Sequence, residues 1–310
     1  AFSFSGSELI GLASAESADP RKSVPAAAKQ VFWRITLFYV ISLTLIGCLI
    51  RYDDPRLIGS SSDDATASPF VIAIVTHGIK GLPSVVNVVI LIAVLSVGNS
   101  AIYMCSRTLS SLCEQGSLPK IFGYIDRKGR PLFSIIFVSL FGLIEFVAAS
   151  DKEGAVFNWL MALSGLSSLF TWGGIFVSHI QFRRALTAQG RGTDELPFVS
   201  PIGVWGSLWG FFIIIMVFIA QFYVAVAPIG DPPNASDFFQ AYLSFPIVLV
   251  FYVGHKIWKK NWKLYKKPAD LDIDTGRRED DIELLKQELA EERAIMAAKP
   301  FILRFYHFWC

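Results

Sequence analysis

Long apolar runs, free of charged residues except for Glu145 in one of them, alternate with short polar connections along most of the chain. Each run is close to the length of about 20 mainly apolar residues that a helix needs to cross the hydrocarbon core of a membrane. Backbone groups in lipid must be hydrogen-bonded within the membrane, so each run is expected to be a helix. The pattern predicts six full spans, near residues 32–51, 83–106, 132–149, 156–180, 204–226 and 238–257.

The composition agrees with this pattern. Hydrophobic residues make up 53% of the 310 residues and charged residues 17%, whereas soluble domains carry about 25% charged residues. The net charge of +2 is too small to indicate a nucleic-acid partner. The fold class expected is therefore an all-α polytopic membrane protein, with membrane lipid as its surroundings.

The charges in the connections indicate which side of the membrane each one faces. Lysine and arginine gather in four regions, at residues 21–34, 107–130, 183–191 and 256–267. The connections between these regions are acidic or carry few cations, at residues 53–64, 150–153 and 231–237. Because basic loops accumulate on the cytoplasmic side, residues 268–310 are expected to form a cytoplasmic tail after a transmembrane region of residues 1–267. Residues 277–298 of that tail have near-helical apolar spacing and predict an amphipathic helix. The apolar segment 68–80 is too short to span and is expected to pack on the bundle from outside.

The first residues carry the most informative chemistry. Glycine and serine surround one carboxylate, Glu8, in an otherwise apolar stretch, at Phe2, Ser3, Phe4, Ser5, Gly6 and Ser7. Glycine and serine weaken a helix, and interrupted helices place free backbone groups at the binding site of many transporters. Small residues also let helices pack closely. Glu8 favours the functional interpretation, because a carboxylate at membrane depth is costly and usually has a function.

An ordered series of blocks resembles the second half of the fungal general amino-acid permeases, in the amino acid–polyamine–organocation superfamily. The blocks are FSFSGSELIG at 2–11, PRKS at 20–23, QVFWRI at 30–35, ASPFVIAI at 67–74, SRTL at 106–109, GSLP at 116–119, FNWL at 157–160 and FWC at 308–310. The resemblance implies a twelve-helix, inverted-repeat (LeuT-like) fold. This chain would then hold part of helix 6 through helix 12, and its partners would be the missing helices 1–5 of the same protein.

The resemblance also implies a binding site. The backbone of Phe2 and Ser5 would contact the α-amine of an amino-acid substrate, the Phe2 ring would match an aromatic gate, and Ser164 would line the side-chain pocket. Ser3, Phe4 and Gly6 would complete the substrate-binding break. Glu8 is expected to couple proton movement to the conformational change, with the proton as coupling ion and no other cofactor.

The function expected is plasma-membrane import of amino acids with protons, with broad specificity. Two alternatives stay open at this point. One is an amino-acid sensor on the same fold that does not transport. The other is a membrane enzyme, although no metal cluster, nucleophile elbow or phosphate loop is found in the sequence.

Three further positions carry expectations. Cys310 ends an aromatic and basic tail, which suits palmitoylation of a cytoplasmic cysteine, the alternative being an unmodified thiol. Asn234 begins an Asn-Ala-Ser glycosylation triplet in a loop expected outside, although such triplets also occur by chance. Trp172 is expected to be a packing or interfacial residue.

Overall fold

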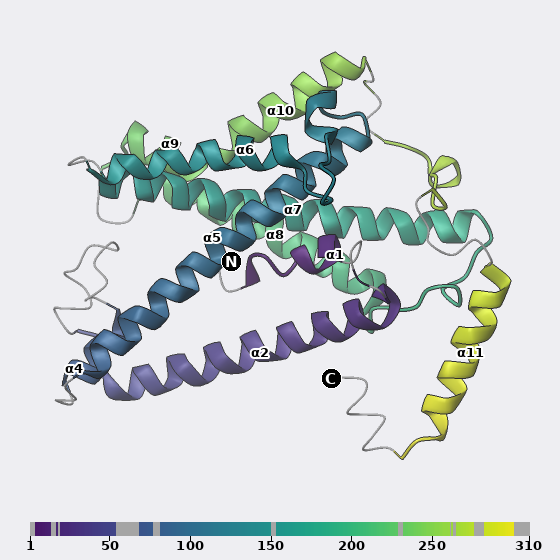
Figure 1. Ribbon diagram of the computed structural model, residues 1–310, viewed down its shortest axis with the longest axis horizontal. Helices are drawn as coiled ribbons and strands as arrows, with labels where there is room; N and C mark the ends of the chain where they lie inside the picture. The colour runs from purple at the N-terminus through teal and green to yellow at the C-terminus, as the bar shows by residue number, and fades with distance from the viewer. Residues whose placement is uncertain are drawn as a thin grey trace. The chain divides into compact units, whose positions relative to one another are not determined.

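The computed structural model of the chain describes residues 4–13, 17, 19–53, 68–76, 81–149, 153–228, 232–260, 262, 265–275 and 282–300. All regular secondary structure in these residues is helical (Figure 1). The α-helices are α1 (Leu9–Ala13), α2 (Pro20–Leu49), α4 (Pro69–Thr76), α5 (Leu82–Glu114), α6 (Leu132–Phe141), α7 (Glu153–Ala188), α8 (Gly203–Val226), α9 (Ala235–Tyr242), α10 (Ser244–Lys259) and α11 (Ile282–Ala298). Three 3₁₀ helices complete the set, η4 (Lys120–Gly123), η5 (Gly142–Ala149) and η6 (Pro268–Asp270).

Four of these helices are long and apolar enough to cross a membrane, among the residues that the structure describes. They are α2, α5, α8 and residues Gly154–Ala188 of α7. Their large apolar side chains are widely exposed, as expected for surfaces that face lipid or further helices. The expected all-α polytopic fold is confirmed.

Two expected spans differ from a single straight helix. The span near 132–149 consists of the α-helix α6 followed by the 3₁₀ helix η5. The span near 238–257 is the pair α9 and α10, whose axes differ in direction by 54° at a short break. An apolar run is compatible with a straight α-helix, with an α-helix followed by a 3₁₀ helix and with a bent pair of helices. Apolar composition alone therefore does not predict which of these structures a span adopts.

The chain divides into two compact units. One contains Ala1–Phe32 and Trp159–Cys310, and the other contains Trp33–Asn158. In the second unit, α4 buries Val71, Ile72 and Ala73, and the cluster includes Ile50 with Ile46 packed against it. The short apolar segment expected outside the bundle is thus a helix packed on the end of α2, within residues 69–76.

In the first unit, α7 and α8 are joined by aromatic and polar contacts. The Phe170 and Phe218 rings lie 4.7 Å apart between centroids, and His179 Nδ1 lies 2.7 Å from Ser207 Oγ. Gly210 of α8 allows the edge of the Phe176 ring of α7 to approach closely, because a Cβ at Gly210 would lie 2.6 Å from that ring. These contacts fix the face of α7 that the candidate site uses.

The same unit holds the bend between α9 and α10 in place. Tyr242 donates its hydroxyl hydrogen to the Phe218 carbonyl at 2.7 Å. Ser244, which is buried, donates to the Leu163 carbonyl at 2.8 Å. The residues on either side of the break are thereby bonded to two different helices, α8 and α7.

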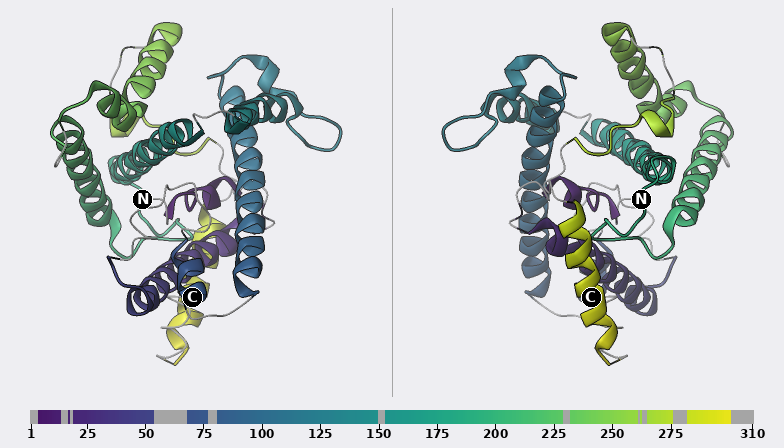
Figure 2. Two further views of the ribbon diagram at one scale, coloured as in Figure 1. Left: turned by 90° about the vertical axis from the view of Figure 1, so that its left-hand side faces the viewer. Right: turned by 90° about the vertical axis from the view of Figure 1, so that its right-hand side faces the viewer.

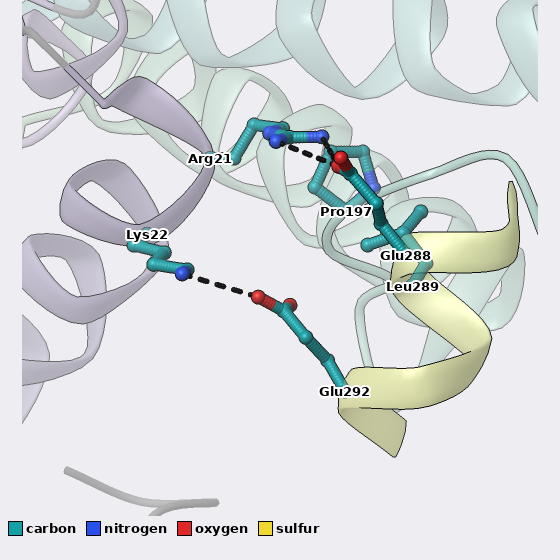
Figure 3. A pocket seen from close by; sticks show the side chains of 6 residues that line it. All are labelled: Arg21, Lys22, Pro197, Glu288, Leu289 and Glu292. Carbon is teal, nitrogen blue, oxygen red and sulfur yellow. Dashed lines mark hydrogen bonds and ion pairs between the residues drawn. The ribbon is translucent and has the colours of Figure 1, made fainter. Parts of the chain in front are cut away.

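Helix α11 lies against the start of α2 (Figure 2). Arg21 pairs with Glu288 at 3.2 Å and Lys22 pairs with Glu292 at 3.1 Å, and these four side chains face one another in Figure 3. Leu289, which follows Glu288 in α11, is buried and lines the same pocket as these four side chains. We call this set of contacts the tail clasp.

Residues just after α7 hold the segment that precedes α11. Gln189 Nε2 donates to the Leu271 carbonyl at 2.8 Å, and Arg191 donates to Asp274 at 2.7 Å. Arg191 also pairs with the buried Glu195 at 3.0 Å. The hydrogen bonds to Asp274 and then to Glu195 raise the pKa of the Arg191 guanidinium above its ordinary value, as carboxylate partners favour the charged form.

Candidate functional site

The glycine-serine stretch at the beginning of the chain is not α-helical in its described part. Residues 4–8 form tight turns closed by i+3 backbone bonds, such as Ser7 N–H to the Phe4 carbonyl at 3.1 Å and Leu9 N–H to the Gly6 carbonyl at 3.1 Å. Gly6 has φ +93°, a conformation that residues with a side chain rarely adopt. The α-helix begins only at Leu9.

The Ser5 carbonyl stands apart in this run of turns. The carbonyls of Phe4, Gly6, Ser7 and Glu8 each accept a backbone N–H, whereas within the described residues none is bonded to the Ser5 carbonyl. Ser5 is also exposed. A carbonyl with open lone pairs is the group that an ammonium requires as acceptor.

Glu8 is half-buried and held from two sides. Its Oε2 accepts the backbone N–H of Gly6 at 3.1 Å and the indole Nε1–H of Trp172 at 3.1 Å. The first bond ties the carboxylate to the turn at Gly6, and the second ties it to α7. The charge on one side chain therefore affects both elements.

One face of α7 meets the broken segment. Ser164, Ser168 and Trp172 follow one another at spacings of four residues and so share a face. Ser168 Oγ donates to the Ser164 carbonyl at 3.1 Å and lies 3.1 Å from Ser5 Oγ. The structure thus connects the break to the α7 face through two side-chain contacts.

The Phe4 ring attaches the break to α2. It lies 6.2 Å from the Phe32 ring, between centroids. The aromatic pair therefore anchors the part of the break that precedes Gly6 and Glu8 in the sequence.

The sequence-predicted residues fall into three groups. Phe4, Ser5, Gly6 and Glu8 lie together in the break, and Ser164 joins them through Ser168. Phe2, Ser3 and Cys310 lie outside the described residues. Asn234 is exposed, at the N-cap of α9, where its side chain accepts the Ser236 N–H at 3.0 Å.

Sequence reasoning missed two members of this site. Trp172 was expected to be a packing or interfacial residue, but its indole N–H bonds to Glu8. Ser168 carried no expectation, although its spacing of four residues from Ser164 was the available signal. Within the described residues, no group of histidine, cysteine or carboxylate side chains has the arrangement of a metal site.

Comparison with known proteins gives a consistent result. The family model described as amino acid permease matches residues 1–268. The chain is 71% identical over its whole length to the general amino-acid permease GAP1 of Saccharomyces cerevisiae, of which it covers 52%. It is 62% identical to the general amino-acid permease GAP2 of Candida albicans, covering 53%, and 52% identical to the histidine permease of Saccharomyces cerevisiae, covering 52%. The chain therefore spans about half the length of these relatives. No solved structure matches it.

Proposed function

Because the chain belongs to the amino acid permease family, we propose that it forms the C-terminal half of a plasma-membrane transporter that carries amino acids together with protons. The relatives are named as permeases, two of them as general amino-acid permeases. These names favour transport over catalysis and over sensing, and they favour a broad range of amino-acid substrates. The rest of the site would come from a part of the transporter that corresponds to the half of the relatives' length that this chain does not cover.

The substrate would bind where the break meets α7. Its α-ammonium group would be accepted by the Ser5 carbonyl, which is left open among the described turns. The residues at Phe2, Ser3, Phe4 and Gly6 would shape that backbone, and the side chain would extend toward Ser164 and Ser168. An unpaired ammonium is costly to remove from water, so a carbonyl fixed in place selects for amino acids over uncharged solutes.

Glu8 would couple the proton to this site, and its two hydrogen bonds are the observation that carries the proposal. An ionised carboxylate accepts N–H groups about twice as strongly as a neutral one. Protonation of Glu8 would therefore weaken its bonds to Gly6 and Trp172 together. The break and α7 could then move relative to one another. Alternating access requires such a movement of helices around the binding site.

The test uses the intact transporter that contains this chain, reconstituted in vesicles with an imposed proton gradient. Uptake of a labelled amino acid is measured for the parent, for Glu8→Gln and for a control, Glu283→Gln, whose side chain is 81% exposed in α11. We expect the parent and the control to accumulate substrate above its external concentration. Glu8→Gln keeps the shape and hydrogen-bonding capacity but cannot titrate, so it should exchange substrate without accumulating it.

Gradient-driven accumulation by Glu8→Gln at the parent level would refute the coupling role. Failure of the parent to take up any amino acid would refute the proposed transport itself. Competition by basic, acidic and neutral amino acids measures the breadth of specificity in the same assay.

A further inference from the structure

A basic and aromatic segment begins in the last turn of α10 and continues beyond its end. Between Ser244 and Pro268 the sequence contains six lysines and no aspartate or glutamate; the lysines are Lys256, Lys259, Lys260, Lys263, Lys266 and Lys267. Trp258, Trp262 and Tyr265 alternate with them. We call residues 256–267 the basic strap.

The first residues of the strap belong to α10, and the residues just after the strap are bonded to the residue that follows α7. At its beginning, α10 stops at Lys259, and Lys260 takes a left-handed conformation with φ 50° that turns the chain away from the helix axis. After its end, the carbonyls of Pro268 and Leu271 accept hydrogen bonds from Gln189, the residue that follows α7. The strap thus begins where the predicted span near 238–257 ends, which places its first residues at the edge of the hydrocarbon.

The side chains of the strap suit that level. Lys259 Nζ lies 5.1 Å from the centre of the Trp258 ring, and Lys256 Nζ lies 5.4 Å from that of Tyr252. Trp258 is 55% exposed and Trp262 66% exposed. Aromatic rings beside lysines are the composition of the interface, where the ring enters the headgroup layer and the ammonium meets phosphate.

Three aspartates follow the strap, at residues 270, 272 and 274; Asp270 is exposed, and the other two have hydrogen-bond partners within the tail or after α7. Asp274 accepts from Arg191 at 2.7 Å. Asp272 accepts the hydroxyl hydrogen of Thr275 and the backbone N–H groups of Asp274 and Thr275. The hydrogen bonds from Thr275 and Asp274, and to a smaller extent the charge of Lys266, lower the pKa of Asp272. Asp272 and Asp274 thus help to fix the tail, and Lys266 of the strap also interacts with a carboxylate.

We propose that the basic strap is a binding site for the headgroups of anionic phospholipids in the cytoplasmic leaflet. The proposal rests on the proposed function as a membrane transporter, and its cytoplasmic side rests on the orientation that the basic connections predict. Lysine clusters next to a membrane helix attract such lipids. The exposed tryptophans favour a lipid surface over a soluble phosphate as the ligand of the strap, since a free phosphate has no apolar part for the rings to contact.

The test uses the purified intact transporter, delipidated and then incubated with mixed micelles of phosphatidylcholine and phosphatidylserine. Native mass spectrometry counts the phosphatidylserine molecules retained. The test variant replaces four described and exposed lysines by glutamine, at Lys259, Lys260, Lys266 and Lys267. The matched control replaces the same four by arginine, which keeps the charge.

We expect retention of phosphatidylserine by the glutamine variant to fall at least about tenfold, since each lysine near an anionic surface contributes roughly a fivefold factor. The arginine variant should retain the parent level, and phosphatidylcholine should not respond. Two paired variants, at Lys259 with Lys260 and at Lys266 with Lys267, should each show part of the loss if the fourfold variant folds poorly.

Three results would overturn the proposal. They are unchanged phosphatidylserine retention in the glutamine variants, an equal loss in the arginine variant, and displacement of the lipid by millimolar inorganic phosphate, which would indicate a soluble phosphate site. None of these readouts depends on uptake. Failure of lipid binding therefore leaves the transport proposal standing, and failure of transport leaves this one testable.

Discussion

The contact between Gly210 and Phe176 offers a direct test of how α7 is positioned. A Cβ at Gly210 would lie 2.6, 2.7 and 3.1 Å from three atoms of the Phe176 ring. Normal carbon contacts are about 3.5–4.0 Å, so Gly210→Ala requires the ring and α8 to separate by roughly 1 Å. Phe176 lies one turn after Trp172, and displacement of its ring would disturb the helix face that bonds Glu8.

The magnitude follows from two opposing terms. Overpacking of this kind costs about 1–3 kcal/mol. Replacing glycine by alanine inside a helix returns up to about 1 kcal/mol. The net loss should reach about 2 kcal/mol, which for a chain of this size lowers Tm by several degrees.

The assay is thermal unfolding of the purified intact transporter, with uptake measured on the same preparation. The matched control is Gly254→Ala in α10, where no heavy atom lies within 4 Å of the added Cβ. We expect Gly210→Ala to melt earlier and to take up substrate more slowly, and Gly254→Ala to melt at the parent temperature or above it. Equal melting of parent and Gly210→Ala, or an equal drop in both variants, would show that the close approach of α8 to α7 does not exist.

Three more outcomes follow from the geometry. Trp172→Phe keeps an aromatic ring but removes the N–H donor, so it should slow uptake more in the parent background than in Glu8→Gln, where a neutral amide accepts that N–H less strongly; equal effects in both would mean that the carboxylate does not bond to the indole. A cysteine placed at Asn234 should react with an impermeant thiol reagent added outside intact cells, and labelling only after permeabilisation would reverse the proposed orientation. Arg21→Glu should increase protease cleavage near α11 by a few-fold, since exposed ion pairs contribute about 1 kcal/mol at most. The charge swap, Arg21→Glu with Glu288→Arg, should restore protection; if it does not, the tail clasp is not an electrostatic contact.

The sequence predicted features that depend on local chemistry. The four long helices follow from uninterrupted apolar runs, and the break follows from glycine and serine around Glu8. Gly6 at φ +93° is a position where residue type alone reports backbone conformation. Each of these features is encoded within a few residues, so no knowledge of the tertiary structure was needed.

The residues that contact the break could not be predicted from local sequence. Trp172 lies 164 residues from Glu8 and Ser168 lies 163 residues from Ser5. A tryptophan in an apolar run can pack in the bundle, lie at the membrane interface or donate its N–H to a carboxylate, and the sequence contains nothing that selects among these roles. Only the path of α7 beside the broken segment determines that its indole N–H bonds to Glu8.

The bend between α9 and α10 combines a local cause in the sequence with a tertiary contact. Residues 238–257 have the composition of one span, but Pro246 has no N–H to donate to the Tyr242 carbonyl and its ring clashes with that carbonyl, which disfavours a straight helix past the end of α9. Buried Ser244, however, must place its hydroxyl on an acceptor, and it bonds to the Leu163 carbonyl of α7. Leu163 precedes Ser164, so the residue at which α10 starts is bonded to the turn of α7 that contains Ser164. The bend itself is encoded at Pro246, whereas the partner of Ser244 is determined by the path of α7 beside α10, which the sequence of the span does not contain.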